Sequence, residues 1–145
     1  MLSPRMFRDL FVPYFKRVFD WIHTNTEWKV FFHCCGSIFN LLPLFIECGV
    51  DILNPVQCSA ARMGPESLKR EFGDKLTFWG GGIDTQDVLP FGTPDAVRAQ
   101  VQQRVEIFGE GGGFVFNPVH NIQHGVPAAN IVACFDAAHE AGSGS

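Results

Sequence analysis

Long apolar runs are missing from this sequence: no stretch approaches the about 18 uninterrupted apolar residues that predict a membrane-spanning helix. Runs of basic residues are missing too, and the formal net charge is -4, so we expect no nucleic-acid partner. The start, MLSPRMFRDLF, lacks the apolar core and small-residue cleavage site of a secretory signal. Together these absences predict a cytoplasmic protein that neither crosses a membrane nor binds nucleic acid.

Charged residues are scarce, at 18% of the 145 residues, whereas 46% are apolar. This balance excludes a disordered or highly charged chain and suffices for the core of one domain. The five cysteines are an odd number in a chain that is not a small disulfide scaffold. We therefore expect a reducing compartment, in which the thiols are free or bind metal.

Neither of the two glycine clusters, at residues 80–82 and 111–113, has the pattern of a nucleotide-binding loop. No Gly-x-Gly-x-x-Gly opens a helix after a strand, and neither cluster is followed by the Lys and Ser/Thr of a phosphate loop. The sequence thus predicts no dinucleotide or P-loop site.

Helical and strand-like segments alternate along the chain. Apolar residues recur every three or four positions from Ser3 to Thr24, which predicts a helix that Pro13 kinks or splits. The predicted strands are 28–32, 50–55, 76–79 and 114–119, and the helices that follow them are 38–48, 65–72, 94–108 and 127–141. Strict alternation predicts parallel strands with right-handed crossovers, an α/β fold whose apolar strands are buried on both faces. We expect one domain over 1–140 and a flexible tail or cloning remnant over 141–145.

Polar side chains gather at the ends of the predicted strands. In a parallel sheet or barrel the carboxyl ends of the strands share one face, where active sites lie. Four strand ends therefore predict one site, with His33 and Cys35, Asn54 and Gln57, Asp84 and Gln86, and Asn117 and His120. Asn54, Gln57, Gln86 and Asn117 are the candidate substrate-binding residues, and Asp84 and His120 the candidate catalytic residues.

The spacing of His33 and Cys35 favours a metal site. Side chains two apart in an extended chain point to the same side, and imidazole nitrogen and thiolate are zinc ligands. A catalytic zinc has three protein ligands and one open position, so His120 is the predicted third ligand. The alternative is that His33 and Cys35 are ordinary packed residues. Asp84 fits equally the cap of a turn, and Asn54 fits a backbone contact at a strand exit.

Three stretches resemble one protein family: FFHCCGSIFNLLPLFIECGVDILNPVQ, LKREFGDKLTFWGGGIDTQDVLPFGTP and GGGFVFNPVHNIQHGVPAANI. The chain resembles the uroporphyrinogen decarboxylase family over nearly its whole length. That family contains decarboxylases of haem biosynthesis and zinc-dependent methyltransferases that take methyl from a corrinoid. The resemblance implies the C-terminal half of a (β/α)8 TIM barrel: four parallel strand-helix units preceded by a helix.

The methyltransferase branch implies a zinc site. Its His-x-Cys-Gly motif is matched by His33, Cys35 and Gly36, and His120 stands where the branch has a later Cys. The implied chemistry is transfer of methyl from a corrinoid, carried by a corrinoid protein, to a zinc-bound thiol.

The decarboxylase branch implies that His120 contacts a porphyrin substrate without a cofactor. Its Arg-rich substrate segment and an Asp belong to an N-terminal half that this sequence lacks, and every arginine here except Arg62 falls on a predicted helix. We favour the methyltransferase branch.

Half a barrel predicts a partner. Four strands leave two open edges and an uncovered inner face, whereas a whole barrel needs about 250 residues. A homodimer or a complementary N-terminal half-barrel would close it, and an inactive fragment that oligomerises is the remaining alternative.

Overall fold

The computed structural model describes residues 3–143. The helices are α1 (Pro4–Leu10), α2 (Val12–Asn25), α3 (Leu42–Cys48, after the 3-10 turn η1, Phe39–Leu41), α4 (Pro65–Phe72), α5 (Val88–Phe91), α6 (Pro94–Gly109) and α7 (Ala128–Gly142). The strands are β1 (Phe31–His33), β2 (Ile52–Asn54), β3 (Thr77–Trp79) and β4 (Phe114–Val115).

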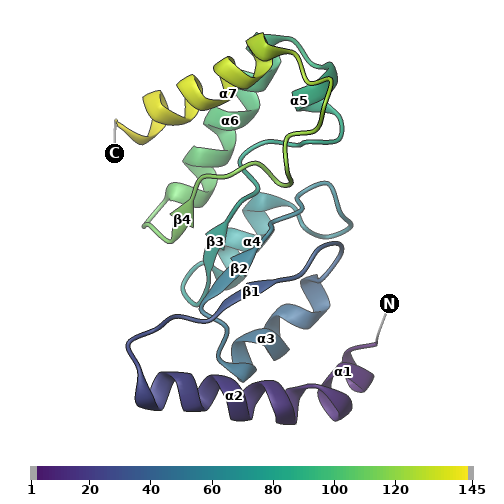
Figure 1. Ribbon diagram of the computed structural model, residues 1–145, viewed down its shortest axis with the longest axis vertical. Coiled ribbons are helices and arrows are strands. Elements are labelled where there is room, and N and C mark those ends of the chain that lie inside the picture. Colours follow the sequence, from purple (N-terminus) through teal and green to yellow (C-terminus); the bar gives the residue numbers. More distant parts are fainter. Residues whose placement is uncertain (1–2, 144–145) are drawn as a thin grey trace.

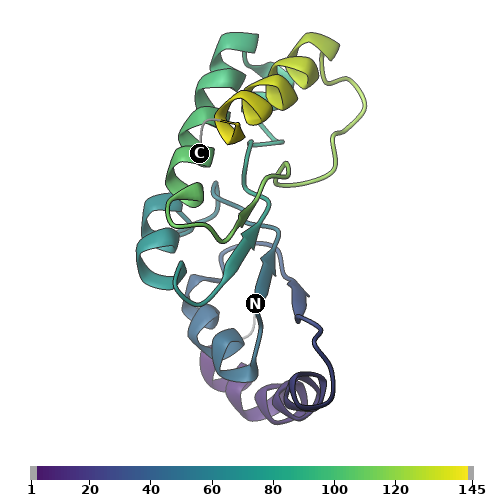
Figure 2. The same cartoon turned by 90° about the vertical axis from the view of Figure 1, so that its left-hand side faces the viewer.

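The strands form one parallel sheet in the order β1-β2-β3-β4. Each strand is followed by helical structure before the next one begins, so sequence neighbours are also neighbours in the sheet (Figure 1). Helices α3, α4 and α6 lie on one side of the strands (Figure 2). The parallel α/β arrangement follows the prediction from the alternation of segments, and four such strand-helix units form half of a (β/α)8 barrel, as the family resemblance implies.

The first helical segment is split, as Pro13 predicts, but the break lies at Phe11. Pro13 occupies the first turn of α2, where a missing N–H removes no helical hydrogen bond. Ser3 caps α1 by accepting a hydrogen bond from the backbone N–H of Met6 at 3.2 Å.

Several element bounds differ from the prediction. All four strands are shorter than their apolar runs, with β1 beginning at Phe31 and β4 ending at Val115. The short helix α5 was not predicted. Helix α7 reaches Gly142, two residues past the predicted domain end, and residues 144–145 lie outside the described part of the chain.

The expectation that both faces of the strands are buried is wrong for the described chain. Leu53 and Phe78, which point toward the helices, are fully buried. On the other face the rings of Phe31 and Trp79 meet edge to face at 5.3 Å, and Phe31 is 47% exposed. The residues of the prospective barrel interior therefore lie open because only one side of the sheet is covered.

The buried side chains form two clusters. The larger joins α1 to α4 with the strands and includes Phe45 and Phe78, and the smaller joins α5, α6 and α7. Helix α6 contributes Phe108 to the larger cluster and Val97 to the smaller. Within residues 3–143, no helix combines the length and apolar character needed to cross a bilayer.

Candidate functional site

The segment after β1 carries the His-x-Cys pair. His33 Nε2 lies 3.4 Å from Cys35 Sγ, and both side chains are exposed. Gly36 follows with φ +92°, a left-handed conformation that a residue with a side chain adopts only with strain. This turn leads the chain away from the strand directly after the pair and leaves both side chains at the carboxyl edge of the sheet.

The segment after β2 holds this motif in place. Asn54 Oδ1 lies 2.7 Å from His33 Nδ1, and Asn54 Nδ2 donates to the carbonyl of Trp79 at 3.0 Å. Gln57 Oε1 accepts a hydrogen bond from the backbone N–H of Gly36 at 2.9 Å. Both predicted substrate-binding amides of this segment are thus bonded to the His33–Gly36 motif.

The segment after β3 is a turn organised by Asp84. Its Oδ1 accepts from the backbone N–H groups of Gln86 at 2.8 Å and Asp87 at 2.7 Å, and its own N–H donates to Gln100 Oε1 at 2.7 Å. These bonds match the turn-cap interpretation of Asp84. Gln86 itself is exposed beyond the turn.

The segment after β4 carries the second histidine. His120 Nδ1 accepts a hydrogen bond from the backbone N–H of Asn121 at 2.9 Å. In a neutral imidazole with Nδ1 as acceptor, Nε2 carries the proton and is a donor. Asn117 Nδ2 donates to the carbonyl of Pro118 at 3.0 Å, so this predicted residue serves its own loop.

A pocket of about 300 Å³ joins these loops. Its walls include four of the predicted residues: Cys35, Gln57, Gln86 and His120. The lining does not include His33, Asn54, Asp84 or Asn117. His33 contacts the lining residue Cys35, and Asn54 in turn contacts His33. The lining residues that sequence reasoning missed are Pro55, Thr85, Val119, Asn121 and Gln123. Each lies within three residues of a predicted one, so proximity to a strand end was the available signal.

Two of the three predicted metal ligands are spaced as zinc requires. Zinc–nitrogen and zinc–sulfur distances of about 2.0–2.1 and 2.3 Å at a tetrahedral angle separate the two ligand atoms by roughly 3.6 Å. The 3.4 Å between His33 Nε2 and Cys35 Sγ fits this spacing. Among residues 3–143, no set of three or more His, Cys, Asp or Glu side chains is arranged around one metal position. Two of the three predicted ligand atoms thus lie close together, and His120 lines the same pocket as Cys35.

The other cysteines differ from Cys35 in their surroundings. Burial raises the pKa of the Cys58 thiol to about 11, and burial followed by the charge of Cys35 raises the pKa of Cys34. Cys48 and Cys134 are buried in the two apolar clusters. All five cysteines are free, and Cys35 is the exposed one.

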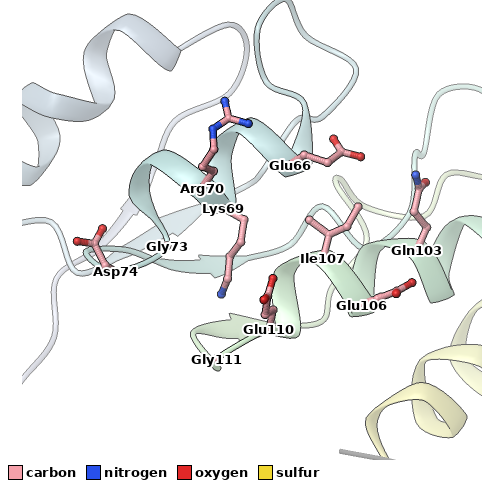
Figure 3. Close-up of a pocket in the computed structure, with 10 residues that line it drawn as sticks. All are labelled: Glu66, Lys69, Arg70, Gly73, Asp74, Gln103, Glu106, Ile107, Glu110 and Gly111. Carbon is pink, nitrogen blue, oxygen red and sulfur yellow. The ribbon is translucent and has the colours of Figure 1, made fainter.

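A larger pocket, of about 910 Å³, lies away from the predicted site, between α4 and α6 and the amino ends of β3 and β4 (Figure 3). Lys69 spans it and donates from Nζ to the carbonyls of Phe108 at 2.9 Å and Gly112 at 2.7 Å. The other charged residues that line this pocket are of both signs, among them Glu66, Arg70 and Glu110. This end of a barrel serves stability rather than catalysis.

Comparisons with known proteins agree on one family. Residues 1–141 match the sequence model described as uroporphyrinogen decarboxylase (URO-D). A uroporphyrinogen decarboxylase of Thioalkalivibrio sulfidiphilus is 27% identical over 148 residues, covering 97% of this chain and 39% of that protein. One from Psychromonas ingrahamii is 26% identical over 147 residues, covering 97% of this chain and 38% of that protein.

A solved structure has the same fold. A methyltransferase from Methanosarcina mazei superposes with a TM-score of 0.72 at 20% sequence identity, over 97% of this chain and 38% of that one. The chain thus spans about two fifths of the length of the relatives that it matches.

Proposed function

The chain belongs to the uroporphyrinogen decarboxylase family, and from this premise we propose that it supplies the zinc-binding half of a methyltransferase-type active site. The proposed reaction moves a methyl group from a corrinoid to a thiol. The observation that carries the proposal is the pairing of His33 Nε2 with Cys35 Sγ at 3.4 Å, on the rim of a pocket at the carboxyl edge of the sheet.

The residues of the chain have distinct proposed roles. His33 and Cys35 bind zinc, and His120 is the third protein ligand. For His120 to bind, its imidazole must turn away from the Asn121 N–H that now occupies Nδ1. Zinc in such a site favours the deprotonated form of a bound thiol and so supplies the nucleophile. The amide of Gln86 lies where it can orient the substrate, and Asp84 holds the turn that presents it.

A partner is proposed to close the barrel. Helix α2 exposes Tyr14, Val18 and Trp21 at helical spacing, with Tyr14 71% exposed, and Trp28, just before β1, is 72% exposed. Large apolar side chains clustered beside an open sheet edge are typical of an interface. We propose the complementary half-barrel as the occupant, because the chain spans only 38–39% of its relatives. A corrinoid protein would then approach the mouth of the completed pocket.

Metal content tests the zinc site. The chain is purified without metal-binding tags, supplied with zinc, dialysed and analysed by mass spectrometry beside Cys35→Ala and the matched variant Cys34→Ala. We expect about one zinc per chain in the unmodified protein and in Cys34→Ala, and loss of zinc in Cys35→Ala. An equal zinc content in all three proteins, or no zinc in any, would contradict the site.

A second candidate function is a decarboxylase-like reaction on a porphyrinogen. The specific observation in its favour is that His120 Nδ1 accepts the Asn121 N–H, which makes Nε2 the donor nitrogen of a neutral imidazole, beside a pocket that Gln57 and Thr85 also line. Such donors suit the carboxylates of a substrate better than they suit a metal. This function predicts no tightly held zinc, and turnover only after the complementary half-barrel is added. Stable stoichiometric zinc would count against it.

A further inference from the structure

Strand register brings two of the predicted residues face to face. His33 and Asn54 are direct partners across β1 and β2, so their side chains leave the sheet on the same face. This placement lets Asn54 Oδ1 approach His33 Nδ1 to 2.7 Å. The contact therefore follows from the alignment of the strands and needs no substrate.

The amide of Asn54 has one orientation that satisfies both of its neighbours. Its Nδ2 donates to the carbonyl of Trp79 at 3.0 Å, and a carbonyl oxygen accepts only from a donor. The oxygen of the amide must then face His33. Because the amide oxygen can only accept a hydrogen bond, the donor must be His33 Nδ1, which therefore carries the ring proton. In the neutral imidazole the unprotonated nitrogen is Nε2, which is the nitrogen beside Cys35 Sγ at 3.4 Å.

We infer that Asn54 is a positioning residue for the metal ligands rather than a substrate contact. It fixes the tautomer and the ring orientation of His33, so that the Nε2 lone pair is presented toward Cys35. Partners of this kind on the second nitrogen of a metal-binding histidine set both its orientation and its basicity. The inference rests on the proposed zinc site and assigns the residue that prepares it.

Gln57 completes the same arrangement. It follows Asn54 by three residues and accepts the backbone N–H of Gly36 at 2.9 Å, which fixes the turn that ends the motif. The β2 exit thus holds the motif at two points, one on each side of Cys35. These two contacts explain why the His33 and Cys35 side chains keep a fixed position relative to each other although both are exposed.

The first test reads the tautomer directly. Long-range nitrogen–proton NMR on the zinc-free chain at pH 8, where an ordinary imidazole is neutral, reports which ring nitrogen of His33 carries the proton. We expect Nδ1–H in the unmodified chain and in Asn54→Asp, which keeps an acceptor, and a mixture of tautomers in Asn54→Leu. Nε2–H as the main form in the unmodified chain would overturn the inference, and this reading needs no variant and no metal.

The second test measures zinc affinity by competition with a chromophoric chelator. Asn54→Leu is expected to bind zinc about 10–100-fold more weakly than the unmodified chain, and Asn54→Asp within a few-fold of it. The control is Asn40→Leu, an exposed asparagine bonded to Arg62 and outside the pocket. Equal affinities of Asn54→Leu and the unmodified chain would overturn the inference and leave the zinc site standing. If the unmodified chain binds no zinc, the proposed function fails and the tautomer alone decides the role of Asn54.

Discussion

Asn130 of α7 donates its side-chain amide to the backbone carbonyl of Leu89 in α5 at 2.9 Å. The same nitrogen reaches the carbonyl of Gly92 at 2.8 Å, and Asn130 is only 2% exposed. Two carbonyls at the end of a four-residue helix are thus satisfied by one side chain from the last helix. Through them α7 steadies the segment that begins at Asp84 and presents Gln86 to the pocket.

Replacing this amide is expected to destabilise the fold. Asn130→Leu removes both bonds and leaves buried carbonyls without donors, at a cost of about 1–3 kcal/mol in the free energy of unfolding. Urea denaturation followed by circular dichroism measures it. Val132→Ala, on an exposed position of the same helix, serves as the control and should change stability by no more than about 0.5 kcal/mol. Equal stabilities of the two variants would contradict a role for the amide.

Gly82 is predicted to tolerate no side chain. A Cβ atom there would collide with Cε2 and Cδ2 of the Phe116 ring, which packs against the smaller apolar cluster. Gly82→Ala should therefore cost about 1–3 kcal/mol through overpacking. Gly109→Ala is the matched comparison, because no atom lies within 4 Å of the added methyl group and α6 gains a better helix former. A thermal melt of both variants should show opposite signs, and a neutral Gly82→Ala would argue against the close approach.

Alkaline pH should weaken the fold through its buried thiols. Burial raises the pKa of Cys134 to about 11, above the ordinary thiol value of 9.0. Between these values the unfolded chain has lost the proton that the folded chain keeps, so stability is full below pH 9 and declines as pH rises toward 11. Cys134→Ala should make this decline less steep, measured as the free energy of unfolding at pH 8, 9, 10 and 11. An unchanged slope would show that the thiol does not contribute.

Lys69 is expected to stabilise the barrel end opposite the site. Lys69→Met removes the two charge-assisted bonds to Phe108 and Gly112 and should lower the free energy of unfolding by about 1–3 kcal/mol. Lys75→Met, on an exposed position nearby, is the control and should be nearly neutral. Zinc content should be unchanged in both variants. Loss of zinc in Lys69→Met with the fold intact would contradict the structural role.

The alternation of strands and helices was predictable because the local spacing of apolar residues indicates each element. Each helix except α5 follows from apolar spacing and capping residues, and parallel pairing follows from the alternation. Strand bounds were less predictable, since apolar runs such as 114–119 continue beyond the point where neighbouring strands still pair. Helix α5 is a single turn of four residues, too short for a periodic pattern.

Sequence reasoning brought several strand-end residues into one candidate site, but it did not predict their contacts. Strand ends placed Cys35, Gln57, Gln86 and His120 around one pocket. The hydrogen bond between Asn54 and His33 depends on the register of two strands, which local sequence does not encode. The hydrogen bond from the Asn121 N–H to His120 Nδ1 likewise depends on the geometry of a loop.

The two apolar clusters that meet along α6 have a consequence for how the chain opens. Local unfolding follows separately packed units, and its free energy sets the rate at which backbone amides exchange with solvent. Val97 and Val101 lie in the smaller cluster and Phe108 in the larger, so the two ends of one helix report on two opening reactions. Protection of α6 amides should therefore change along its length, and the more weakly protected end identifies the unit that opens at the lower cost in free energy.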